Sequence, residues 1–100
     1  MHTHIVFFWL DERADEAERK SLTEDCYKLL EPIEIVKELR VGAPSGTSRP
    51  IVDRTYDLAI VVTFENLADH DAYQDHPLHH EFVEKHKDYW TKCQVYDIAS

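Results

Sequence analysis

The sequence is poor in glycine, proline and cysteine, with two, four and two of these among its 100 residues. So few glycines and prolines exclude a collagen-like or Pro/Gly-rich disordered chain. Cys26 and Cys93 lie far apart and lack CxxC spacing, so we expect buried, reduced thiols rather than a disulfide framework. Gly42 and Gly46 form no phosphate-binding motif. With no repeat or linker, the chain is predicted to be a single domain, 1–100.

Basic residues are also scarce, because 11 Lys and Arg stand against 20 Asp and Glu, for a formal net charge of -9. That balance excludes nucleic acid and anionic membranes as partners, since both need clustered cations. No apolar run approaches the roughly 18 to 20 residues of a membrane span, and the first residues do not read as a signal peptide. We therefore expect a cytoplasmic protein.

Hydrophobic residues make up 43% of the chain, which predicts a folded core. Strand patterns occur at 3–10, 33–42, 55–64 and 93–98, with a loop at 43–53. Helices are predicted from an N-cap at Asp11 to about Leu30, from an N-cap at Asn66 to Tyr73 or Asp75, and onward from Pro77. The order β-α-β-β-α-β predicts an α+β, ferredoxin-like antiparallel sheet with helices on one face.

The first strand is apolar on both of its faces, with His4, Val6 and Phe8 on one and Ile5 and Phe7 on the other. A sheet with helices on one side leaves the second face open to water. The simplest cover for that face is a second copy of the chain, so we expect a homodimer.

Histidines are concentrated in the segment that turns at His76-Pro77. In the helix that follows, spacings of three and four residues place His79 and His86 on the apolar stripe and turn His80 outward. Zinc would need three or four of the histidines to converge, whereas His79 and His80 diverge by about 100° around the helix axis. His76 suits a helix cap, and no metal site is predicted.

Three stretches resemble the stress-responsive dimeric α/β barrel (Dabb) family: 4–8, 56–65 and 72–79. The last contains the family pattern of Tyr, two residues, His-Pro, one residue and His. The resemblance implies a ferredoxin-like domain that dimerises into a barrel, with no cofactor. The family includes plant stress proteins without an assigned reaction and one polyketide cyclase, olivetolic acid cyclase.

The resemblance to the cyclase implies catalytic roles for Tyr73 and His79 and a place in the cavity for His4. His79 would act as the base, and the Tyr73 hydroxyl would stabilise the developing enolate. The sequence differs from the cyclase at Leu58, where the cyclase has another cavity histidine. The other possibility is that His79 bonds a backbone carbonyl and Tyr73 packs in the core.

Three classes of function remain open. The leading expectation is a homodimeric stress-response barrel that binds a small apolar or aromatic molecule or has a protective role. The alternative is a cyclase or lyase that uses His79, Tyr73 and His4. Haem-handling monooxygenases of similar fold form a third class, which no residue pattern specifically supports.

Overall fold

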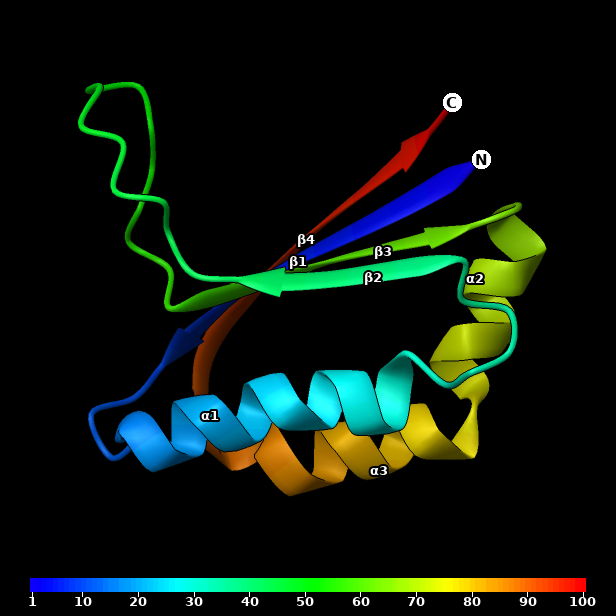
Figure 1. Cartoon of the computed structure of the whole chain (residues 1–100), viewed down its shortest axis with the longest axis horizontal. Helices are drawn as coiled ribbons and strands as arrows, with labels where there is room; N and C mark the ends of the chain where they lie inside the picture. Colours follow the sequence, from blue (N-terminus) through cyan, green and yellow to red (C-terminus); the bar gives the residue numbers. More distant parts are fainter.

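A computed structural model describes residues 1–100 as one four-stranded antiparallel sheet with three helices on one face (Figure 1). The elements in chain order are β1 (His2–Leu10), α1 (Glu16–Asp25), β2 (Glu38–Gly42), β3 (Leu58–Phe64), α2 (Leu67–Asp75), α3 (Pro77–His86) and β4 (Trp90–Ala99). The strand order β2-β3-β1-β4 confirms the ferredoxin-like α+β prediction. None of the helices has the length and apolar character needed to cross a membrane.

The two faces of the sheet have different surroundings. His4, Val6 and Phe8 of β1 are buried against the helices, while Ile5 and Phe7 are half-buried on the opposite face. This alternation follows from the two-residue period of a strand. In Figure 1 α1 and α3 lie below the sheet, α2 runs down from its right-hand end, and the loop of residues 43–57 rises on the other side.

The hydrophobic core fills the space between the sheet and the helices. Its members come from β1, β2, β3, α1, α2, α3 and the turns after α1. The most deeply buried are Phe64, Val62, Cys26, Leu30, Ile33 and Tyr73. Tyr73 therefore serves both the core and the site described below.

The first helix begins one turn later than the sequence indicated. Asp15 is its N-cap, with a side-chain oxygen 2.9 Å from the backbone N of Glu18. The prediction of Asp11 as the cap is wrong, because residues 12–13 form a separate turn, closed by the Ala14 N–H that donates to the Asp11 carbonyl at 3.0 Å, and the helix begins only after Asp15. A π-helical turn, Cys26–Leu30, continues α1, so the predicted end at Leu30 is confirmed.

The strand bounds also differ from the prediction. Of the stretch 33–42, only Glu38–Gly42 is a strand, because residues 31–35 form turns that bury Ile33 in the core. The third strand begins at Leu58 rather than at residue 55, and β4 starts before residue 93. Cys93 is exposed on β4, which corrects the expectation that both thiols are buried; Cys26 is fully buried, and both are free.

Candidate functional site

A cavity of about 160 Å³ lies between the sheet and helices α2 and α3. Its walls are mostly apolar, with Val6, Phe8 and Ile60 from the sheet and Phe82 and Val83 from α3. The polar residues that line it include His4, Tyr73, Gln74 and His79. All three residues predicted as site residues, His4, Tyr73 and His79, therefore face the same cavity.

The break between α2 and α3 brings Tyr73 and His79 together. His76 ends α2, and its Nδ1 accepts a hydrogen bond from the backbone N of Leu78 at 3.0 Å, while Pro77 begins α3. This confirms the prediction that His76 is a cap residue. The redirected chain places the Tyr73 and His79 rings edge to face, with centroids 4.8 Å apart.

Three polar groups on the cavity wall lack partners within the chain. The Trp90 indole Nε1 is buried without a hydrogen-bond acceptor. The Tyr73 hydroxyl and the His79 ring nitrogens make no hydrogen bond to protein either, so His79 is not tied to a backbone carbonyl. The Trp90 Nε1 is enclosed by protein atoms, whereas the Tyr73 hydroxyl and the His79 nitrogens are free to bond a polar atom of a ligand in the cavity.

Burial sets the protonation of the two central residues. It lowers the pKa of His79 from 6.5 to about 4, with further lowering from His4, His80 and His70, so the imidazole is neutral at neutral pH. Burial likewise raises the pKa of the Tyr73 hydroxyl, which stays protonated. The cavity thus presents a phenol donor beside an uncharged imidazole.

His4 occupies one end of this cavity and is 4% exposed. Its Nδ1 lies 2.6 Å from Asp97 Oδ1, and its ring centroid lies 6.2 Å from that of Tyr73. Burial lowers the pKa of His4, although the bond to Asp97 opposes this shift. Asp97 therefore holds the His4 ring in place at the cavity wall.

His4 belongs to a wider polar cluster, His2, His4, His70 and Asp97, which the sequence analysis missed. His2 and His4 share a face of β1, Asp97 is the register partner of His4 on β4, and α2 places His70 above them. The sequence contained one indication of this cluster, because His2 and His4 are two residues apart in the first strand and so share a face. Finding Asp97 and His70 required the strand register and the helix position.

The histidines of the segment 76–86 do not converge. His80 is exposed, and His86 is buried between α1 and α3, where it contacts Asp25 and Glu18. Leu58 is not in the cavity wall and lies instead beside an open groove of about 800 Å³ next to α1. Most side chains of that groove are charged or polar, with Arg19 paired to Asp57 at 2.7 Å, so it is a solvated surface.

Comparison with known proteins matches this arrangement to a family. Residues 3–100 match the sequence model of the stress responsive A/B barrel domain, Dabb. A search of curated proteins found no match.

Several solved structures share the fold. A protein from Arabidopsis thaliana is 21% identical with a TM-score of 0.86, covering 100% of this chain and 95% of its own. A dimeric ferredoxin-like protein of unknown function from Thermobifida fusca is 22% identical with a TM-score of 0.85, covering 99% and 90%. The hydroxynitrile lyase of Passiflora edulis is 24% identical with a TM-score of 0.81, covering 97% and 90%. At these identities the likeness concerns the fold alone.

Proposed function

The chain belongs to the stress-responsive A/B barrel (Dabb) family, and on this premise we propose that it is a homodimeric protein that binds a small apolar or aromatic molecule. One observation carries the proposal. An apolar cavity is lined by two polar side chains, Tyr73 and His79, that make no hydrogen bond within the chain. A core built only for packing would bond these groups internally.

The size and chemistry of the cavity define the ligand class. Its volume of about 160 Å³ is close to the roughly 150 Å³ of an apolar cavity that holds benzene. The Tyr73 hydroxyl can donate a hydrogen bond to a ligand, and the neutral His79 imidazole can donate or accept one. A single-ring aromatic or short aliphatic molecule with one carbonyl or hydroxyl oxygen satisfies these requirements.

The homodimer is supported by the uncovered face of the sheet. Ile5, Phe7 and Trp9 are only half-buried there, and Tyr96 and Ile98 of β4 are 56% and 50% exposed. A second copy packed on this face would remove the patch from water. The Thermobifida fusca protein of similar fold is described as dimeric, which supports a dimer here as well.

Binding is tested with a matched series of probes, namely benzene, phenol and benzaldehyde. The chemical shifts of the cavity residues in NMR spectra report the binding of each probe. We expect phenol and benzaldehyde to shift the Tyr73, His79 and Trp90 signals and to bind more tightly than benzene. Removing one hydrogen bond through Tyr73→Phe should weaken benzaldehyde binding about tenfold. Tyr27→Phe, which changes an exposed tyrosine, serves as the control. Equal affinity of the three probes, or no effect of Tyr73→Phe, would refute the binding mode.

A second candidate is an enzyme of the cyclase or lyase type. The observation that favours it is the contact between the Tyr73 and His79 rings at one cavity. His79 would accept a proton from the substrate, Tyr73 would donate to its carbonyl oxygen, and His4 would assist at the cavity end. A pKa of about 4 makes His79 a weak base at neutral pH, which is why binding is the leading proposal.

A turnover assay with linear polyketide-type ketones and aromatic cyanohydrins distinguishes the enzyme from the binding protein. An enzyme converts one of these classes, and His79→Gln abolishes turnover while benzaldehyde still binds. A binding protein shows no turnover in the wild type and retains its probe affinities.

A further inference from the structure

We propose that His2, His4, His70 and Asp97 form a site for one zinc-type divalent metal ion. The site goes beyond the proposed function, because it needs no molecule in the cavity. All four residues place a ligand atom within 4.8 Å of the others, and the three histidines are buried. Three imidazoles and a carboxylate form a donor set suited to zinc and its neighbours among the divalent transition metals.

The distances between the ligand atoms lie on both sides of the spacing in a tetrahedral zinc site. Asp97 Oδ1 lies 3.0 Å from His2 Nε2, 2.6 Å from His4 Nδ1 and 3.7 Å from His70 Nε2. His70 Nε2 and His4 Nδ1 are 3.2 Å apart. Bonds of about 2.0–2.1 Å around zinc place tetrahedral ligand atoms about 3.3 Å from one another. Small side-chain movements therefore complete the site.

His70 is oriented as metal-binding histidines usually are. Its Nδ1 lies 3.0 Å from Asp71 Oδ1, so the ring donates a proton there and its Nε2 keeps a lone pair. The Gln74 amide, 3.1 Å away, donates to that lone pair in the metal-free protein. Asp71 thus acts as a positioning residue, and the Gln74 amide turns aside when a metal takes its place.

In the metal-free protein, hydrogen bonds between these side chains satisfy the same ligand atoms. Asp97 Oδ1 accepts hydrogen bonds from His2 and His4. To bind an ion, the neutral rings of His2 and His4 carry their proton on the other ring nitrogen, and the freed lone pairs of His2 Nε2 and His4 Nδ1 become ligands. Because four protein ligands fill a tetrahedral shell, the ion would have a structural role and fasten α2 to β1 and β4.

The test is titration of untagged, chelator-treated protein with zinc and with cobalt, by calorimetry and visible absorption. We expect one ion per chain, the intense visible bands of tetrahedral cobalt, and a zinc-dependent rise in melting temperature. Absence of saturable binding at one ion per chain would overturn the proposal and leave the cluster as a hydrogen-bonded polar core.

Variants separate this site from the other histidines of the chain. His70→Ala and Asp97→Asn should each abolish the cobalt bands, and Asp97→Asn keeps the side-chain volume on an accessible strand so that folding is retained. Asp71→Asn should weaken zinc binding about 10- to 100-fold by disturbing the orientation of His70. His80→Ala, an exposed histidine outside the cluster, should bind as the wild type does. If His80→Ala and Asp97→Asn reduce binding equally, the ion lies elsewhere and the assignment is wrong.

Discussion

His86 is a buried bridge between two helices. Its Nε2 lies 2.7 Å from Asp25 Oδ2 and its Nδ1 3.1 Å from Glu18 Oε1, and the residue is 1% exposed. Both ring nitrogens face carboxylate oxygens of α1, so the ring links α3 to two acidic side chains of that helix. Lys85 also contacts Asp25 at 2.8 Å, so α3 supplies two donors to one buried carboxylate of α1.

His86→Ala should lower the free energy of unfolding by about 3 kcal/mol, because Asp25 then loses a donor in a buried setting. Urea unfolding followed by circular dichroism measures the change. The matched control is His80→Ala on the exposed face of the same helix, which should stay within about 0.5 kcal/mol of the wild type. Equal stabilities of the two variants would contradict the bridging role.

His79 should make stability depend on pH between its unfolded and folded pKa values. Burial lowers its pKa from 6.5 to about 4, so the unfolded chain binds the proton more tightly than the folded protein. The contribution of neutral His79 to the free energy of unfolding is therefore full above pH 6.5, and it is lost as the pH falls toward 4. An NMR titration of the His79 ring should give a pKa well below that of exposed His80. In His79→Gln the loss of stability across this range should be smaller, and a His79 pKa near 6.5 would contradict the burial argument.

The residues of the site were only partly predictable. The family pattern pointed to Tyr73, His79 and His4, and the structure places all three at one cavity. His70 and Asp97 carried no local signal, because their meeting depends on the β1–β4 register and on the position of α2. Side chains joined by tertiary pairing cannot be found from spacing along one element.

At the scale of elements, α2 is the segment on which both sites depend. It carries His70 toward the histidine cluster and Tyr73 toward the cavity, yet it is a helix of nine residues. A helix this short is marginal by itself and relies on its caps and packing. At its start the Asn66 side chain accepts a hydrogen bond from the Asp69 backbone N at 2.9 Å.

Asn66→Ala should therefore lower the free energy of unfolding by about 1 kcal/mol through loss of this cap. Hydrogen exchange should show the amide protons of α2 losing protection before those of α3. Asn66→Asp keeps the acceptor oxygen and should preserve most of the stability. If alanine and aspartate behave alike, the cap does not hold the helix.

The sequence predicted the type and order of the helices and strands correctly, but it placed the first residue of some of them wrongly. Asp11 and Asp15 both precede acidic helix residues, and local cap chemistry could not choose between them. The Asp11 N–H bonds the carbonyl of Tyr89, far away in the chain, which holds Asp11 beside the sheet, and the turn at residues 12–13 then separates Asp11 from the helix. The predicted strand 33–42 is likewise longer than the observed one, because Ile33 is buried in a turn. The alternation of apolar and polar residues along the sequence does not distinguish such a turn from a strand.

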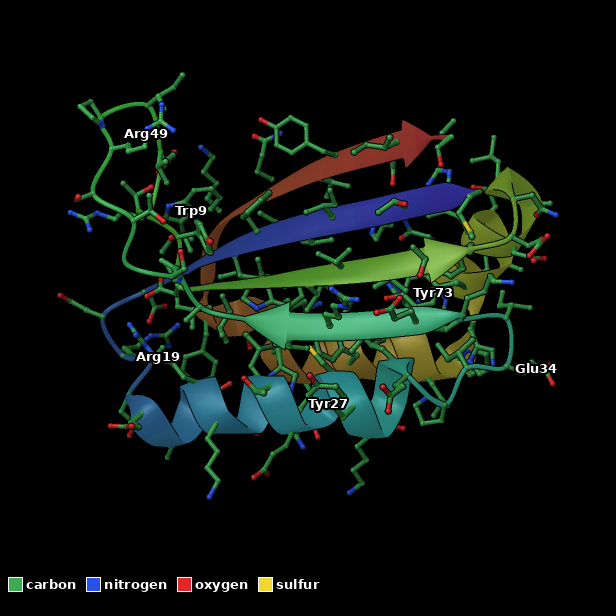
Figure 2. All side chains as sticks on the ribbon, turned by 45° about the horizontal axis from the view of Figure 1, so that its top comes forward. Trp9, Arg19, Tyr27, Glu34, Arg49 and Tyr73 are labelled. Atoms are coloured by element: carbon green, nitrogen blue, oxygen red, sulfur yellow. The ribbon has the colours of Figure 1, made fainter.

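For the whole molecule, the contrast between the two sides of the sheet matters most. Figure 2 shows the strands with side chains standing off the face that carries no helix, and Tyr27 on the helical side. Phe7 lies in the middle of this open face, where its ring contacts Tyr56 and Tyr96 edge to face, with centroids 4.9 and 6.3 Å away. A homodimer would cover this cluster.

Phe7→Glu should convert the dimer into a monomer, because a carboxylate would be buried without a partner at the interface. Light scattering at micromolar concentration measures the mass. Tyr27→Glu introduces the same charge on the helical side and should leave the mass unchanged. A monomeric wild type would contradict the dimer, and a dimeric Phe7→Glu would show that the open face is not the interface.

The two ends of the described chain lie side by side (Figure 1). The amino group of Met1 donates to the Ser100 carbonyl at 2.9 Å, and the Ser100 N–H donates to the Met1 carbonyl at 3.0 Å. A circular permutant that joins residue 100 to residue 1 and opens the loop between Gly46 and Pro50 keeps every strand pair. In it the β4–β1 pairing becomes a local hairpin, whereas the β2–β3 pairing becomes distant in sequence. Because the β4–β1 ladder is the longer of the two, the mean sequence separation of contacts falls, and the chain should reach the same fold faster.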